Sequence, residues 1–191
     1  LSNDVSKFKY HLLDAENYKF LNYKFIKCRE IDDAKEFNDL MQAFKIMGFN
    51  VDIVDNILKI VASVLHLGNI TFDDDGNIKG NNEINIVCQL LGLEKECLIE
   101  SISYRYLKTG NENIRIKMNK EESVKALNSL VMKLYENTFN YIVKTINDKL
   151  NTNCSSFIGI LDIFGFETFE NNYFEQFCIN YTNETLQEHF N

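Results

Sequence analysis

Three residues near the end of the sequence, Asp162, Gly165 and Glu167, have types and spacing that suit phosphate chemistry. They lie in the stretch FIGILDIFGFETFE, directly after an apolar run. A carboxylate at such a point can hold the hydration shell of a magnesium ion, and a glycine lets a backbone N–H come close to a phosphate. The pattern predicts a phosphate-handling site, and an ordinary strand exit that ends on a solvated acid fits it as well.

The element that would position these residues is a strand over residues 157–163. Residues 157–161 are apolar or glycine without alternation, which is typical of a strand buried on both faces. In open α/β sheets, ligands bind beyond the carboxyl ends of such strands, and Asp162 falls at that end. A helix is expected to begin near Asn172, with Glu175 three residues on, and to continue to the end of the sequence.

A second candidate site lies between residues 103 and 118. Two alternating runs, 103–108 and 114–118, flank Gly110 and Asn111, which predicts a β-hairpin. Between residues 104 and 120 the only acid is Glu112, and the basic residues are Arg105, Lys108, Arg115, Lys117 and Lys120. The hairpin is therefore either a basic interaction surface or an ordinary solvated ribbon.

Most of the remaining sequence has helical periodicity. Apolar residues recur at three- and four-residue steps over 32–48, 50–68, 84–91, 96–102 and 119–150. Asn119 and Glu122 have the spacing of a capping box, and Asp75–Gly76 predicts a turn. His66 is expected to serve the last carbonyls of its helix, without a catalytic or metal-binding role. The fold class is thus mostly α with a few β-strands.

Composition restricts the class of protein further. The 191 residues are 45% hydrophobic and 25% charged, which predicts a globular chain with a core. The net charge of −8 argues against nucleic acid as the main partner. The five cysteines contain no C-x-x-C pair, so a reducing cytosol fits better than a disulfide framework or a zinc site. No apolar run is long enough for a transmembrane segment, and the start is not a secretory signal.

The stretch LDIFGFETFENNYFEQFCINYTNETLQEHFN resembles the switch II element and the first half of the relay helix of the myosin motor. LHLGNITF and KTGNENI agree with the same family in the same order, so the resemblance covers essentially the whole chain. Departures at Tyr173 and Phe177, among others, suggest a divergent unconventional myosin. The missing initial Met and the helical pattern at the end lead us to expect a fragment of a larger protein.

The resemblance implies a fragment of the α/β P-loop NTPase myosin motor fold. Residues 1–155 would form the helical upper subdomain of the actin-binding cleft, with its hairpin loop at 103–118. Residues 156–167 would form a central-sheet strand and switch II, and residues 168–191 the start of the relay helix.

The resemblance also implies roles for the first candidate site. Asp162 would lie near the nucleotide and contact its magnesium ion through water, and Gly165 would donate its N–H to the γ-phosphate. Glu167 would pair with an arginine of switch I and close the phosphate pocket. The implied cofactors are ATP and Mg²⁺, and the implied activity is that of an actin-activated ATPase.

In myosins the position of the hairpin is an actin-contacting surface loop. The residues implied to contact actin are Arg105, Lys108, Glu112, Arg115 and Lys117, and Glu112 stands where myosins carry an acid or a phosphorylatable residue. Further implied partners are light chains or calmodulin-like proteins, through a lever that is not in this chain. The implied location is the cytoplasm, on the cytoskeleton.

Several parts of such a motor are absent from the sequence. There is no G-x-x-x-x-G-K-[ST] loop and no switch I arginine, so this chain alone is expected to be catalytically inactive and to expose apolar edges. One alternative is a degenerate motor that binds actin without cycling. Another is a different P-loop NTPase with a D-x-x-G switch, and the relay-helix string argues against it.

Overall fold

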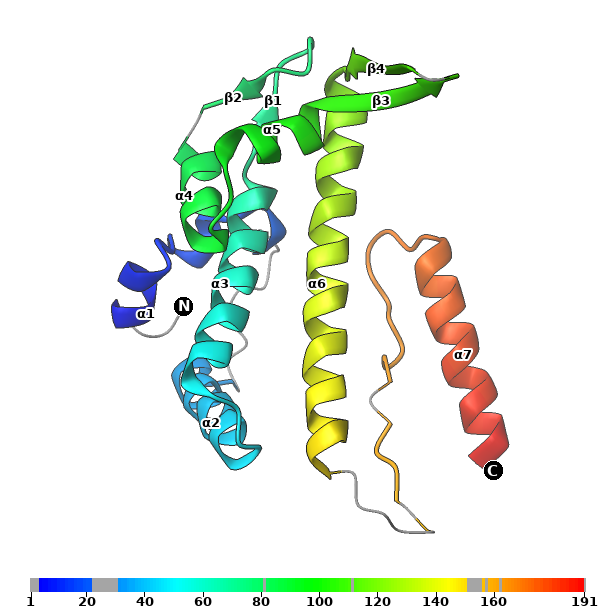
Figure 1. Cartoon of the computed structure of the whole chain (residues 1–191). Coiled ribbons are helices and arrows are strands. Elements are labelled where there is room, and N and C mark those ends of the chain that lie inside the picture. The colour runs from blue at the N-terminus through cyan, green and yellow to red at the C-terminus, as the bar shows by residue number, and fades with distance from the viewer. Residues whose placement is uncertain are drawn as a thin grey trace. The chain divides into compact units, whose positions relative to one another are not determined.

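The computed structural model describes residues 4–21, 31–80, 82–110, 112–150, 156, 158–161 and 163–190. It is mostly helical, as predicted, with two antiparallel strand pairs in the described residues (Figure 1). The chain divides into two compact units, residues 1–151 and 152–191. No helix in the described ranges has both the length and the apolar character needed to cross a bilayer.

The first unit contains all of the described strands and most of the helices. Its elements in chain order are α1 (Asp4–Lys9), the 3-10 turns η1 (Ala15–Asn17) and η2 (Lys19–Leu21), α2 (Asp33–Ile46), α3 (Val51–Gly68), β1 (Thr71–Phe72), β2 (Ile78–Lys79), α4 (Asn82–Leu91), α5 (Lys95–Ser103), β3 (Tyr104–Thr109), β4 (Glu112–Lys117) and α6 (Lys120–Leu150).

The core of this unit forms around α3, which packs against α4 on one side and against α6 on another (Figure 1). Its largest buried cluster joins side chains from α3, α4, α5, α6 and the segment that carries β1: Val64, Leu67, Ile70, Phe72, Ile84, Val87, Leu98, Ile102, Leu127 and Val131. Fully burying one such side chain stabilises the fold by about 1.5–3 kcal/mol. The helices are therefore held by packing of their apolar faces.

The predicted helix starts carry the expected caps. The side chain of Asp32 accepts hydrogen bonds at the start of α2, and that of Asn50 does so at the start of α3. At α6 the capping box is complete, because Glu122 N–H donates to Asn119 Oδ1 at 3.0 Å and Asn119 N–H donates to Glu122 Oε2 at 3.1 Å. Both contacts satisfy backbone groups that the helix leaves unpaired.

His66 differs from the prediction. It is fully buried, and its Nδ1 lies 2.7 Å from Glu83 Oε2, while its Nε2 lies 3.4 Å from the carbonyl oxygen of Tyr10. Its ring also meets the Tyr18 ring edge-on, with centroids 5.5 Å apart. A buried imidazole needs partners for both nitrogens, and here they come from α4 and from the segment after α1. His66 therefore fixes residues 10–18 on α3 and does not serve the end of its helix.

The two hairpins lie where turns were predicted. In the shorter one, Phe72 pairs with Ile78, and Gly76 has a φ of +74°. A Cβ at Gly76 would lie 2.1 Å from the carbonyl oxygen of Met118, so this position needs glycine for both reasons. In the longer one, β3 pairs with β4 from Tyr104↔Lys117 to Thr109↔Glu112.

The second unit contains α7 (Phe174–Phe190), which begins two residues after the predicted start near Asn172. The strand predicted over residues 157–163 is absent from the described residues of that range, so this prediction is corrected. Ile158 and Ile160 are 98% and 97% exposed. A strand requires a hydrogen-bonded neighbour, and no described segment pairs with this one. The expected exposure of apolar side chains is present here.

Candidate functional site

The loop that carries Gly165 and Glu167 is held by one polar side of α7. Asn180 makes two hydrogen bonds to the backbone of Glu167: its Oδ1 accepts from Glu167 N–H at 2.8 Å, and its Nδ2 donates to the Glu167 carbonyl at 2.8 Å. A side-chain amide thus satisfies the donor and the acceptor of one residue, as a neighbouring strand would. This fixes the position of Glu167 relative to α7.

The neighbouring polar residues of α7 extend this contact. Gln176 Nε2 donates to Glu167 Oε2 at 3.3 Å, and Asn183 Nδ2 donates to the carbonyl of Gly165 at 3.2 Å. Gln176, Asn180 and Asn183 are spaced by four and three residues, so they share one face of the helix. The structure therefore brings Gly165 and Glu167 together on a common support.

Gln176 also serves the start of α7. Its Oε1 accepts from Tyr173 N–H at 2.9 Å, which is one half of a capping box. Just before it, Asn172 Oδ1 accepts from Phe169 N–H at 2.9 Å and Asn172 Nδ2 donates to the Phe169 carbonyl at 2.8 Å. The same short stretch thus caps the helix and contacts the loop.

Gly165 is a glycine that the chain itself does not need. Its φ lies outside the left-handed region, and apart from its chain neighbours no heavy atom of the described residues lies within 4 Å of the place where a Cβ would stand. Space for a ligand to approach the backbone is therefore open on that side. Asp162 lies outside the described residues. Among the described ones, no group of three or more His, Cys, Asp or Glu side chains could hold a metal ion.

The hairpin separates its five predicted contact residues. Side chains of paired residues lie on the same face, and the face alternates along each strand. The register therefore puts Lys108, Arg115 and Lys117 on one face of the hairpin, and Arg105 and Glu112 on the other. These residues do not form a single basic surface.

Arg115 is engaged at the base of the hairpin. Its Nε and Nη2 donate to the two carboxylate oxygens of Glu100 in α5, at 2.6 and 2.5 Å, and its guanidinium carbon lies 3.4 Å from the centre of the Tyr104 ring. Tyr106 donates its hydroxyl to the same carboxylate. Hydrogen bonds from Arg115 and Tyr106 lower the pKa of Glu100 to about 2, and the pKa of Arg115 is raised. We call these four residues the hairpin clamp.

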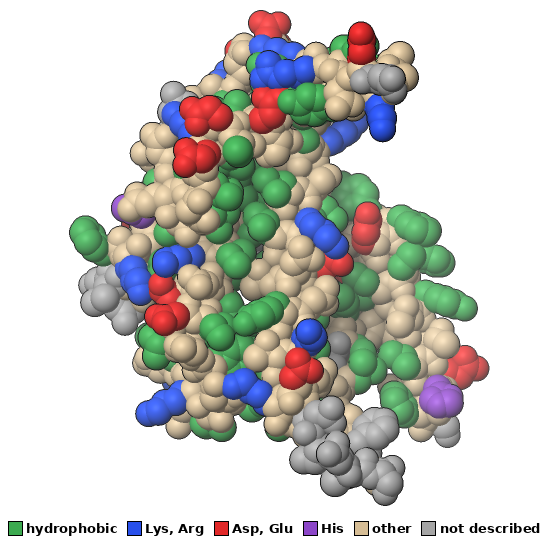
Figure 2. All heavy atoms as spheres, viewed as in Figure 1, with side chains coloured by type: hydrophobic (Ala, Val, Ile, Leu, Met, Phe, Trp, Pro, Cys, Tyr) green, Lys and Arg blue, Asp and Glu red, His purple; other side chains and the backbone are tan. Residues whose placement is uncertain are grey.

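The other hairpin residues differ in how far they are engaged. Arg105 Nε lies 3.6 Å from Glu122 Oε1, and Lys117 Nζ donates to Asn77 Oδ1 in the β1–β2 turn. Within the described part of the chain, Lys108 and Glu112 have no hydrogen-bonded or ion-paired side-chain partner. Figure 2 shows acidic and basic side chains interspersed at the hairpin end of the first unit. The side chains of Lys108 and Glu112, beside the turn, are thus the ones open to a partner.

The residues that hold the loop and the residue that binds the hairpin were not among those selected from the sequence. Gln176, Asn180 and Asn183 have a readable signal, because amide side chains at helical spacing follow the loop directly in the sequence. Glu100 has none, since it lies 15 residues from Arg115 and any of several acids could have been the partner. Ion pairs of this kind are visible only once the strand register is known.

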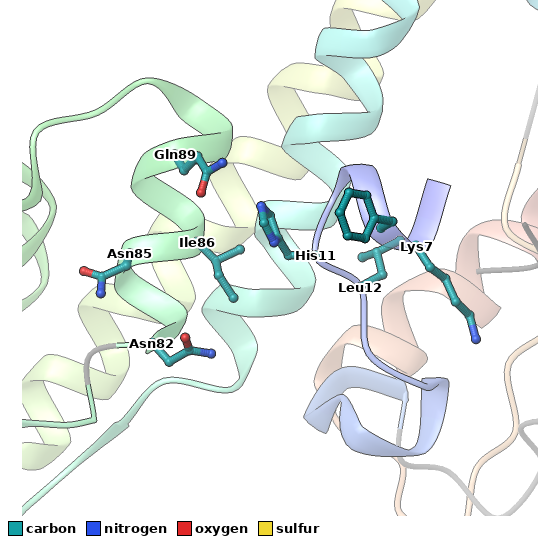
Figure 3. Close-up of a pocket in the computed structure, with 8 residues that line it drawn as sticks. Lys7, His11, Leu12, Asn82, Asn85, Ile86 and Gln89 are labelled. Atoms are coloured by element: carbon teal, nitrogen blue, oxygen red, sulfur yellow. The ribbon is translucent and has the colours of Figure 1, made fainter. Parts of the chain in front are cut away.

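A separate hollow of about 690 Å³ lies beside α1 and α4 (Figure 3), and it is lined by the polar residues Lys7, His11, Asn82, Asn85 and Gln89 and by the apolar residues Phe8, Leu12 and Ile86. It contains none of the predicted site residues. Its three amide side chains are exposed on the surface of α4, and Lys7 is bound to Asp14 at 2.9 Å. None of the described polar residues that line it is buried, so the arrangement does not indicate a ligand site.

Comparison with known proteins places this chain in a family. Residues 2–191 match the family model of the myosin head (motor domain). A protein named "Probable myosin heavy chain" from Encephalitozoon cuniculi is 38% identical over 185 residues, covering 94% of this chain and 11% of that protein. Myosin-2 of Saccharomyces cerevisiae is 36% identical over 196 residues, which is 97% of this chain and 12% of that protein.

Unconventional myosin-Ib of Homo sapiens is 35% identical over 188 residues, covering 93% of this chain. The chain spans 16% of that relative's length, and 11% and 12% of the other two. The similarity runs through both structural units, including the loop with Gly165 and Glu167 and the hairpin. The chain therefore belongs to the myosin motor-domain family.

Proposed function

We propose that this chain is part of an actin-based motor that couples ATP hydrolysis to force on actin filaments. In this proposal residues 162–167 are the γ-phosphate-sensing switch II, α7 is the start of the relay helix, and the hairpin is an actin-contacting loop. The observation that carries the proposal is the pair of hydrogen bonds between Asn180 and the backbone of Glu167, because it couples the sensing loop to the helix.

Gly165 would sense the phosphate through its backbone N–H. The open space beside it supports this role, since a side chain at this position would occupy the path by which a phosphate oxygen approaches. ATP with Mg²⁺ would supply the transferable phosphoryl group and offset its negative charge. The carboxylate of Asp162 would accept hydrogen bonds from water molecules that coordinate the Mg²⁺ ion.

Glu167 would act as the latch. Gln176 holds one oxygen of its half-buried carboxylate, which orients the side chain and leaves the other oxygen to accept from a switch I arginine. Formation of this ion pair would exclude bulk solvent from the site. It would also help to position the one water molecule that attacks the phosphate. Hydrolysis would proceed by in-line attack of that water, without a covalent intermediate.

Asn180 and Asn183 would transmit the state of the loop. They hold the backbone of Glu167 and Gly165, so the loop cannot move toward a phosphate without pulling on α7 or losing three hydrogen bonds. A few contacts to one phosphate can in this way bias an element that has two positions.

The remaining parts of the proposal concern partners. Lys108 and Glu112, beside the turn of the hairpin, would contact the actin filament, with Arg105 and Lys117 nearby. Light chains or calmodulin-like proteins would bind a lever outside this chain. The proposed location is the cytoplasm, on the cytoskeleton.

The test is actin-activated ATPase activity of a complete motor that includes this chain. Glu167→Gln and Gly165→Ala should each lower the turnover rate by about 100-fold or more. The first removes the charge that would pair with the switch I arginine, and the second places a Cβ in the path by which a phosphate oxygen would approach the N–H of residue 165. The matched control, Glu184→Gln, changes an exposed acid of α7 and should leave the rate unchanged. Full activity of both site variants would overturn the proposed role of the loop.

Two further outcomes distinguish the alternatives. A parent motor that binds actin filaments but hydrolyses no ATP would favour an actin-binding protein that does not cycle. This chain by itself should show no magnesium-dependent ATP turnover, since it has no G-x-x-x-x-G-K-[ST] loop. Turnover by the isolated chain would contradict the proposed division of the site between this chain and the rest of the motor.

A further inference from the structure

We propose that Arg115 is a positioning residue of the hairpin: it holds the hairpin on α5 through Glu100 and does not itself contact the partner. This inference rests on the proposed function, in which the hairpin binds actin. It reassigns Arg115 from a contact residue to a residue that acts at a distance.

The geometry of the hairpin clamp carries the inference. Both carboxylate oxygens of Glu100 accept from Arg115, one of them also accepts from Tyr106, and the ring of Tyr104 covers the guanidinium. The guanidinium is thus bound by a bidentate ion pair and by an aromatic face together. Moving this guanidinium toward an acid of a partner would break the bidentate pair and the ring contact together, so we infer that it stays on Glu100.

The clamp also lies at the right place to set the direction of the hairpin. Tyr104 and Tyr106 belong to β3, Arg115 belongs to β4, and Glu100 belongs to α5, so the clamp joins both strands to the helix. Glu112 lies three residues beyond Arg115, which is about 10 Å along the strand. A small change of angle at the base therefore becomes a larger displacement at the turn, where Lys108 and Glu112 are.

Positioning and contact predict different signs for two substitutions. Glu100→Gln removes a negative charge beside the hairpin, and Arg115→Gln removes a positive charge from it. If Arg115 met acidic groups of actin, Glu100→Gln would free it and strengthen binding, while Arg115→Gln would weaken it. If Arg115 positions the hairpin, both substitutions release the base and both weaken binding, because the hairpin must then be ordered on binding.

The experiment measures actin affinity of the complete motor by co-sedimentation at several salt concentrations. We expect Arg115→Gln and Glu100→Gln each to weaken affinity by about threefold to tenfold, and the double variant by no more than either alone. The exchanged pair, Glu100→Arg with Arg115→Glu, should recover most of the affinity. The control pair, Lys133→Gln and Glu136→Gln, removes an exposed 2.9 Å ion pair of α6 and should change nothing.

Hydrogen exchange of the β3 and β4 amides provides the second measurement. Both single substitutions should speed exchange in the hairpin, and the exchanged pair should slow it again. Opposite effects of the two substitutions on affinity, or a failure of the exchanged pair to recover it while exchange is restored, would overturn the inference. A parent motor that does not bind actin would instead refute the proposed function, and hydrogen exchange would still show whether Arg115 positions the hairpin.

Discussion

The hairpin and the loop of residues 163–169 are both candidate functional segments, and they are stabilised in different ways. The hairpin forms its backbone hydrogen bonds between its own strands and is anchored on α5 by the hairpin clamp. The loop has no strand beside it and takes its described hydrogen bonds from Asn172 and from side chains of α7. The hairpin is therefore stabilised by its own two strands and by the preceding helix. The segment before the loop, which was predicted to be a strand, would need a paired strand, and no described segment provides one.

This comparison predicts unequal effects of similar substitutions in the two units. Ile102→Ala, in the core of the first unit, should lower the free energy of unfolding by about 2–5 kcal/mol, because it leaves a cavity at a side chain with 0% exposure. Ile160→Ala, before the loop, should change it by less than about 0.5 kcal/mol, because that side chain is 97% exposed. Urea denaturation followed by circular dichroism measures both, and equal effects would contradict the contrast.

Loss of Asn180 should release the loop without unfolding the first unit. Asn180→Ala removes two hydrogen bonds to the backbone of Glu167, each of which contributes about 0.5–1.5 kcal/mol. Hydrogen exchange at the Glu167 amide should then become about tenfold faster or more. Thr182→Ala is the control, since the described hydrogen bond of the Thr182 hydroxyl goes to the carbonyl of Cys178 in its own helix. An unchanged exchange rate at Glu167 would show that the amide does not hold the loop.

The helix caps allow a smaller comparison. Asn119→Ala removes the side-chain oxygen that accepts from Glu122 N–H, and keeps the backbone N–H that donates to Glu122 Oε2. Loss of this half of the capping box at α6 should lower the free energy of unfolding of the first unit by about 0.5–2 kcal/mol. Lys125→Ala, at an exposed position further along α6, serves as the control and should change it little. Thermal unfolding of the chain measures both. An equal change of the unfolding midpoint in the two variants would mean that the capping hydrogen bond does not stabilise α6.

The smallest expected effect is the pH dependence of the hairpin clamp. The pKa of Glu100 falls from an ordinary 4.5 to about 2, because Arg115 and Tyr106 donate hydrogen bonds to the ionised carboxylate. The ionised form therefore stabilises the fold above pH 4.5, and this contribution disappears as the pH falls through 2. Solvent screening at this exposed position keeps it small.

Comparison with Glu100→Gln isolates that contribution. The difference in unfolding midpoint between the parent chain and this variant should be largest at neutral pH and should shrink as the pH falls from 4.5 toward 2. A difference that grows with falling pH would contradict the assignment of the clamp.

The sequence predicted elements whose interactions are local. The capping box of Asn119 and Glu122 and the turn at Gly110 depend on residues a few positions apart, and both are present in the structure. The strand over 157–163 was wrong for the described residues because apolar composition shows that a segment could be buried, and does not show what would cover it. His66 was misread for a similar reason, since Glu83 and Tyr10 are 17 and 56 residues away in the sequence.

The candidate sites follow the same rule. Gly165 and Glu167 could be selected from residue type and spacing, and the structure adds that α7 holds both of them. The five residues named on the hairpin came from the resemblance and from the basic character of the segment, and neither could show that Arg115 is bound to Glu100. Selection by residue type finds candidates, whereas the contacts decide which side chains are open to a partner.

We propose above all that the loop of residues 163–169 and α7 move together. Hydrogen exchange over residues 163–183 of a complete motor, with and without MgATP, tests it most directly. We predict that the nucleotide changes hydrogen exchange in both the loop and α7 of the parent motor, and in the loop alone in Asn180→Ala. No change in α7 of the parent, or a joint change that persists in Asn180→Ala, would contradict it.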